Sequence, residues 1–151
     1  MLLLIFHVGK NLYAIDSSRV VEVIPRVSYR PVHHVPDYVI GVFNYRGSIV
    51  PAIDLCRMIR GTPSQEYLST RVIMVSYPCP DGKLRHIGLM AERVIETLDR
   101  SEADFKETGI RTHEARYLGG ISTDKKGMIQ QLCLDRLFSD IQHINLLNES
   151  A

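Results

Sequence analysis

The sequence has no tryptophan, few other aromatic residues and no excess of either charge. Aromatic residues make up 7% of its 151 residues, and 18 Lys and Arg stand against 17 Asp and Glu. A general nucleic-acid-binding domain normally carries a basic excess for phosphates and exposed rings that stack on bases. The composition argues against that class. The neighbours Tyr45 and Arg46 and the loose basic stretch 26–34 leave a small-barrel ligand- or nucleic-acid-binding module as the alternative function.

Cysteine is also sparse. Cys56, Cys79 and Cys133 lie far apart, and none belongs to a CxxC pair, which argues against a disulfide framework and against a zinc site. Three isolated thiols suit a reducing cytoplasm. The apolar run Met1–Phe6 follows no cationic segment and is too short for a signal peptide or a membrane span. We therefore expect a cytoplasmic protein that does not insert into a membrane.

Common catalytic motifs are missing too. The chain contains no GxSxG, GxxxxGK followed by Ser or Thr, GxGxxG or HExxH. His33 and His34 are adjacent, so in an extended segment they point to opposite faces and are poorly placed to share one metal ion. Cys56 and Cys133 stand in apolar runs, which favours buried packing over a reactive thiol. A thiol-dependent enzyme is therefore only the third interpretation of the function. We expect no catalytic, cofactor-binding or metal-binding residues.

Short apolar runs separated by turn residues predict a mainly β protein with a core, since 45% of the residues are apolar. Pro51 lies within one run and predicts an edge strand or a bulge there. The expected strands are Leu2–Val8, Leu12–Ile15, Arg19–Ile24, Val39–Phe43, Ser48–Ile53, Arg71–Tyr77, Leu84–Met90, Val94–Leu98, Leu118–Ile121 and Met128–Leu134.

The end of the chain alone has a clear helical period. Apolar residues from Leu134 to Leu147 recur every three or four positions and predict one terminal helix. The many short strands are typical of small β-barrels. We expect one domain over residues 1–151, made of two barrel subdomains that meet near residues 60–70, with the terminal segments packed on either.

One segment is much more specific than the rest. Residues 41–55 read GVFNYRGSIVPAIDL, and this stretch resembles the signature of the CheW family, the scaffold proteins of bacterial chemosensory arrays. The positions that match this signature are Gly41, Asn44, Arg46, Gly47, Pro51, Asp54 and Leu55. Ordered similarity continues in residues 12–24, 36–41, 87–94 and 117–138, so the resemblance covers nearly the whole chain.

The resemblance implies a fold and a function. The fold is two five-stranded, SH3-like β-barrels packed side by side, with a hydrophobic groove between them and here a short C-terminal helix. The implied function is that of a non-catalytic adaptor without a cofactor, which couples chemoreceptors to a CheA-type histidine kinase. Its implied partners are the kinase regulatory domain and the cytoplasmic tip of a methyl-accepting chemoreceptor, with other CheW-like proteins as further candidates.

The resemblance also assigns residues. It implies partner contacts by Val20, Glu22 and the turn Asn44, Tyr45, Arg46 and Gly47, and a structural role for Gly41, Pro51, Asp54 and Leu55. Two residues apart on one strand, Val20 and Glu22 should share a face. Arg46 could contact a partner or tie its loop to Asp54 or to a barrel end. The chain departs from the family pattern at Tyr45, Gln130, Gln131 and Cys133.

Overall fold

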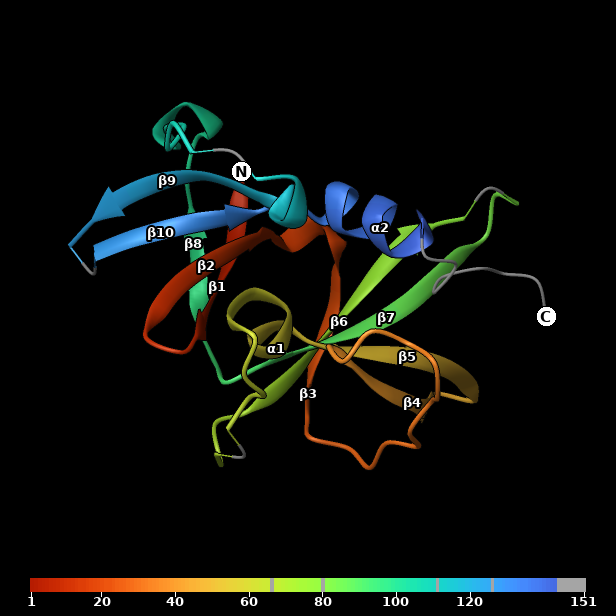
Figure 1. The fold of residues 1–151 in the computed structure, drawn as a ribbon. Helices are drawn as coiled ribbons and strands as arrows, with labels where there is room; N and C mark the ends of the chain where they lie inside the picture. The colour runs from red at the N-terminus through yellow and green to blue at the C-terminus, as the bar shows by residue number, and fades with distance from the viewer. Residues whose placement is uncertain (66, 80, 111, 126, 144–151) are drawn as a thin grey trace.

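The computed structural model describes residues 1–65, 67–79, 81–110, 112–125 and 127–143, and in these residues ten strands form two five-stranded sheets (Figure 1). The mainly β fold class is therefore confirmed. The strands are β1 (Leu2–Val8), β2 (Asn11–Asp16), β3 (Val20–Pro25), β4 (Val39–Tyr45), β5 (Ser48–Asp54), β6 (Arg71–Pro78), β7 (Leu84–Ala91), β8 (Arg93–Asp99), β9 (Leu118–Asp124) and β10 (Gly127–Leu132).

The chain passes from the first sheet to the second and then returns. The first sheet has the strand order β8-β1-β2-β10-β9, and the second has the order β3-β6-β7-β5-β4. Both ends of the described chain therefore contribute to the first sheet. The predicted meeting point near residues 60–70 lies between β5 and β6, which belong to the same sheet, so it does not separate the two units.

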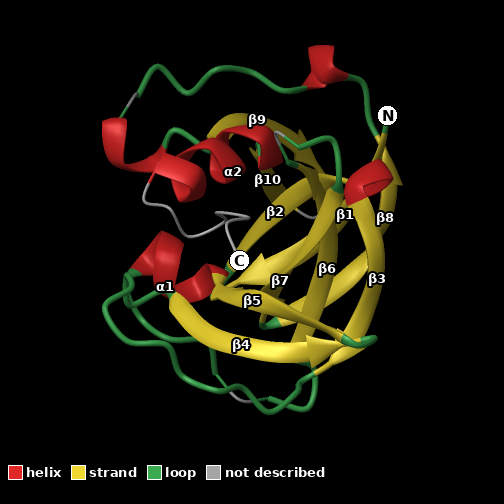
Figure 2. Cartoon of the chain, turned by 90° about the vertical axis from the view of Figure 1, so that its right-hand side faces the viewer, coloured by secondary structure: helices red, strands yellow, loops and turns green. Residues whose placement is uncertain are grey.

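Two α-helices lie on the same side of the strands (Figure 2). The predicted terminal helix is α2 (Leu134–His143), whereas Ile144 and Leu147 of that prediction lie outside the described residues. The helix α1 (Leu55–Arg60) was not predicted from the sequence, and it is only six residues long. Asp54 caps its N-terminus, and Gly61 ends it in the left-handed conformation with φ 81°. None of the helices within the described residues is long and apolar enough to cross a membrane.

The apolar core has three parts. Each sheet encloses a small cluster, which contains Leu3 and Ile5 in the first sheet and Phe43 and Met74 in the second. The largest cluster lies between the sheets and also includes buried residues of both helices, among them Leu55 and Phe138. The space between the sheets is thus a shared core.

Pro51 lies in an interior strand, so of the two predicted alternatives the edge strand is wrong for β5, whereas the register of the β4–β5 pair does shift close by, between Val39 and Gly41. On one side Pro51 opposes Val42 of β4, within the antiparallel β4–β5 pair. On the other side the parallel pairing with β7 covers Ala52 to Asp54. Proline is tolerated because it stands just before this pairing begins, where the ladder with β7 needs no donor from it.

Candidate functional site

The most specific part of the sequence folds into a tight hairpin turn between β4 and β5. Arg46 and Gly47 are its two central residues, and both have positive φ, 51° and 88°. This is the geometry of the two-residue turn that matches the twist of paired strands. The Asn44 side chain accepts a hydrogen bond from the Gly47 backbone N–H at 2.9 Å. The local sequence therefore fixes the turn that displays Arg46.

Arg46 has two partners at this turn. Its guanidinium donates a hydrogen bond to the carboxylate of Glu22 on β3, and its centre lies 5.3 Å from the centroid of the Tyr45 ring. The Arg46 side chain is nevertheless 67% exposed. Arg46 therefore ties its turn to β3, instead of to Asp54, and still presents much of its donor surface to solvent.

Tyr45 does not lie on the exposed surface that the sequence analysis assigned to it. The residue is 7% exposed and belongs to the core of the second sheet. Its ring packs edge-on against Phe43 and His86, with centroids 6.4 and 5.6 Å away. Burial raises the pKa of its hydroxyl group. Tyr45 therefore supports Arg46 from below and leaves the outer contact to the charged residues.

Val20 and Glu22 do not share a face, contrary to the prediction. The pairing of β3 with β6 shifts between them, so that Val20 opposes Val75 and Glu22 opposes the adjacent Met74. Adjacent residues of a strand point to opposite faces, and opposed residues point to the same face. The bulge therefore turns Val20 toward the core between the sheets and Glu22 toward the other face of β3, beside Arg46.

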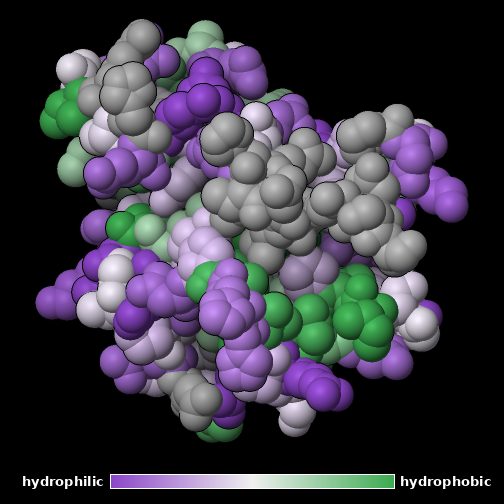
Figure 3. All heavy atoms as spheres, turned by 45° about the vertical axis from the view of Figure 1, so that its right-hand side comes forward, coloured by the Kyte–Doolittle hydropathy of each residue, from purple (hydrophilic) through white to green (hydrophobic). Residues whose placement is uncertain are grey.

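A shallow depression begins directly after the turn. Its volume is about 360 Å³, and it includes the exposed apolar residues Val32, Ile49 and Leu84. Figure 3 shows apolar side chains gathered on this side of the molecule. The other lining residues are Val39, Val42, Ser48, Val50, Pro51, Tyr77, Arg85 and His86.

Of the four residues predicted to be structural, Pro51 lines this depression, and Gly41, Asp54 and Leu55 do not. Gly41 has φ 152°, and a Cβ atom there would lie 2.2 Å from the carbonyl oxygen of Arg30. Asp54 is 4% exposed and accepts hydrogen bonds from the backbone N–H groups of Cys56, Arg57 and Ser64 and from the Ser64 hydroxyl. Leu55 is fully buried. These residues shape the hairpin and the helix after it.

The structure places the three thiols and the adjacent histidines that the sequence singled out. Cys56 and Cys79 are buried, Cys133 is partly buried, and burial raises the pKa of the Cys56 and Cys133 thiols. His33 and His34 are exposed in the loop before β4. Among the described residues no group of three or more His, Cys, Asp or Glu is placed to hold a metal ion.

The other departures from the family pattern lie in or next to the first sheet. Gln130 of β10 donates a side-chain hydrogen bond to the carbonyl of Gly119 at 3.1 Å. Gln131 pairs with Ala14 of β2. Cys133 lies beside Gly119, where an added Cβ would be 3.3 Å from its sulfur. None of these contacts involves the Arg46 turn, so the three departures leave the surface around Arg46 unchanged.

Comparisons with a family model, with known sequences and with a solved structure agree with one another. A family model described as CheW-like domain matches residues 2–142. The chain is 30% identical to a chemotaxis protein CheW of Treponema pallidum, over 97% of this chain and 86% of that protein. It is 28% identical to a chemotaxis protein CheW of Rhizobium meliloti, over 90% and 86% of the two chains. A scaffolding protein of Thermoanaerobacter tengcongensis, TtCheW, has the same fold, with a TM-score of 0.74, 24% identity and 87% of each chain covered.

Proposed function

Because the chain belongs to the CheW-like domain family, we propose that it is a non-catalytic adaptor that couples chemoreceptors to a CheA-type histidine kinase in a chemosensory array. The observation that carries the proposal is the family match over residues 2–142, which includes the Arg46 turn. An adaptor of this kind works by holding two partners at once. Each interface can then be small and weak, because the array supplies avidity.

The partner surface that we propose is built around Arg46 and Glu22. Both side chains are accessible, and Asn44 and Gly47 set the turn that presents them. A guanidinium held in a fixed place can bind carboxylates or backbone carbonyls of a partner with defined geometry. The depression beside the turn, with the exposed side chains of Val32, Ile49 and Leu84, would add contact area. Val20 packs against the core between the sheets, on the opposite face of β3, and we leave it out of this surface.

The proposed partners are the regulatory domain of the kinase and the cytoplasmic tip of a receptor. Other CheW-like proteins are further candidates, because an array repeats the same kinds of contact. We place the protein in the cytoplasm, attached to membrane receptors through these partners and without insertion of its own chain. The nucleic-acid alternative loses support, since its best stacking candidate, Tyr45, is buried.

Titration calorimetry tests the proposal directly. The full chain is titrated with the purified regulatory domain of a CheA-type kinase and, separately, with a receptor-tip hairpin. We expect saturable binding, and we expect Arg46→Glu to weaken it while the circular dichroism spectrum stays unchanged. Arg93→Glu is the matched control, because Arg93 is an exposed arginine on β8 of the other sheet. Absence of binding to both partners by the folded wild-type chain would refute the proposal.

A further inference from the structure

Glu92 occupies the single position at which the chain crosses from the second sheet to the first. It stands between the last residue of β7 and the first residue of β8. Although it is a charged residue, it is only 5% exposed. A buried carboxylate is costly unless hydrogen bonds compensate for the lost water. The hydrogen-bond donors to the Glu92 carboxylate should therefore explain why a charged residue is buried at this position.

The two carboxylate oxygens of Glu92 bind different parts of the fold. Oε1 accepts a hydrogen bond at 2.8 Å from the backbone N–H of Gly9, in the turn between β1 and β2 of the first sheet. Oε2 accepts one at 2.9 Å from the backbone N–H of Gln65, in the loop between α1 and β6. The Cys56 thiol lies 3.6 Å from Oε1 as a further donor. One side chain thus connects a turn of the first sheet to a loop of the second.

Further contacts surround Gly9 and the backbone of Glu92. Gly9 has φ 60°, and a Cβ atom there would lie 2.3 Å from Nη1 of Arg60 at the end of α1. The positive φ favours glycine here, and the backbone of the turn packs directly against the Arg60 side chain. On the other side, the Ser69 hydroxyl donates to the backbone carbonyl of Glu92 at 3.1 Å. The crossing point is held from both sheets.

We propose that Glu92 is a positioning residue that fixes the angle between the two sheets, and with it any partner surface to which both sheets contribute. The shared core holds the sheets together, but the hydrophobic effect has no direction. Charge-assisted hydrogen bonds to fixed backbone groups do have direction, and they are strong in a buried site. The second half of the inference, the effect on a partner surface, rests on the proposed adaptor function. The first half, the effect on the angle between the sheets, does not.

Asp54 provides a matched control for Glu92. Both are buried carboxylates that accept several hydrogen bonds, but the donors to Asp54 all lie within residues 56–64. Asp54→Asn therefore removes comparable interactions without touching the connection between the sheets. In Glu92→Gln, the amide NH₂ group faces one of the two backbone N–H donors, so at least one hydrogen bond is lost.

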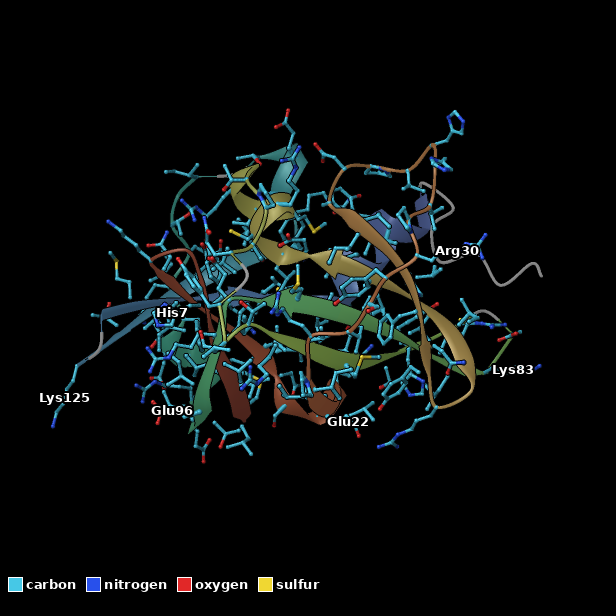
Figure 4. The ribbon with its side chains drawn as sticks, turned by 90° about the horizontal axis from the view of Figure 1, so that it is seen from below. His7, Glu22, Arg30, Lys83, Glu96 and Lys125 are labelled. Carbon is cyan, nitrogen blue, oxygen red and sulfur yellow. The ribbon has the colours of Figure 1, made fainter. Side chains whose placement is uncertain are left out.

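The angle can be measured by distances between spin labels in the isolated, full-length protein. Lys83 follows β6 and Lys125 follows β9, and Figure 4 shows them at opposite ends of the molecule. Cysteines introduced at both sites carry the labels, in a Cys133→Ala background because Cys133 is partly exposed. We expect Glu92→Gln to shift or broaden the distance distribution, and Asp54→Asn to lower stability and leave the distribution unchanged. Identical distributions for Glu92→Gln and the wild type would overturn the inference.

Two further measurements keep the test decisive. If Glu92→Gln does not fold, Glu92→Asp keeps the charge and shortens the reach by one methylene, and the same shift is expected. For the functional half we take the receptor-tip hairpin as the partner that contacts both sheets, so its affinity should fall about tenfold in Glu92→Gln, or about 1.4 kcal/mol, and stay unchanged in folded Asp54→Asn. Equal losses in both variants would overturn this half. If the wild type binds neither the hairpin nor the kinase regulatory domain, the proposed function fails, and the label distances still decide the positioning role.

Discussion

Arg46 and Glu22 connect the two edge strands of the second sheet. Glu22 lies on the edge strand β3, and Arg46 directly follows the other edge strand, β4. Their side chains form an ion pair. The pair therefore helps the sheet to curl, because it links strands that are not paired with each other in the ladder. The same two charges remain accessible to a partner, so the local tie and the partner contact can be separated by exchange of the charges.

Charge exchange is the first prediction. Arg46→Glu alone places two carboxylates face to face and should lower the free energy of unfolding by about 0.5–1 kcal/mol, the range expected for an exposed pair. The double variant Glu22→Arg, Arg46→Glu restores attraction and should recover most of this loss. Urea denaturation of the four proteins of the cycle measures the coupling.

Partner binding should respond differently to the same exchange. If the charges contact the kinase domain or receptor tip, the double variant recovers stability and remains defective in binding. Recovery of both properties in the double variant would instead make the pair a local tie alone.

Arg46→Asn is the second prediction. Arginine has no preference for φ 51°, whereas Asn followed by Gly is the favoured pair for this turn. The substitution should therefore leave the melting temperature unchanged or raise it, since relief of backbone strain offsets the lost ion pair. Binding should still weaken, because the guanidinium is gone. A fall in stability of more than about 1 kcal/mol would show that the ion pair outweighs the strain.

Most of the fold could be predicted from the sequence because its causes are local. Apolar runs bounded by turn residues located each of the ten strands to within a few positions, for example Leu2–Val8. The turn at Arg46 and Gly47 was equally local, since its geometry follows from four consecutive residues. The helix α1 was missed although its signals were present, with Asp54 as the N-cap and Gly61 as the stop. Six residues are too few to show a helical period.

The rest depends on contacts between distant residues. The bulge that separates the faces of Val20 and Glu22 arises from the register with β6, more than 50 positions along the chain. The partner of Glu92 in the first sheet is 83 positions away, and nothing near either residue indicates the other. Likewise, the burial of Tyr45 depends on Phe43 and His86 and could not be derived from the turn itself.

The glycines of the signature give a third prediction, because two of them have positive φ in different surroundings. Gly41→Ala places a methyl group against the backbone of Arg30, which cannot move without breaking the bridge to Val42, and should cost about 2–4 kcal/mol. Gly47→Ala meets no atom within 4 Å and should cost about 1 kcal/mol from its backbone conformation alone. Thermal unfolding of both variants checks the order, and equal losses would contradict the clash.

Thiol reactivity is the fourth prediction and separates an adaptor from a thiol-dependent enzyme. Cys56 and Cys79 are buried, and the raised pKa of Cys56 leaves little thiolate at neutral pH. A thiol-titrating reagent should therefore label both slowly in the native protein and label all three cysteines at once in denaturant. Cys133, which is partly buried, should react at an intermediate rate. Rapid labelling of Cys56 in the folded protein would contradict this.

The fifth prediction concerns stability at high pH and rests on Tyr117. This residue is buried, its hydroxyl lies 3.4 Å from the Met58 carbonyl in α1, and burial raises its pKa to about 12. In the unfolded chain the pKa of tyrosine is about 10. Below pH 10 both states hold the proton, so the contribution to stability is fully present. Between pH 10 and 12 the unfolded chain ionises first, and the free energy of unfolding falls.

The expected slope is about 1.4 kcal/mol per pH unit for each such tyrosine, so a few kcal/mol are lost across this window. Tyr29, whose pKa burial also raises to about 12, should add to the same fall. Urea denaturation at several pH values measures the slope, and phenolate absorbance follows ionisation. Tyr117→Phe removes the titrating group and keeps the ring, so its curve should be flatter than the wild type above pH 10. An unchanged slope in Tyr117→Phe would mean that the hydroxyl ionises equally easily in both states.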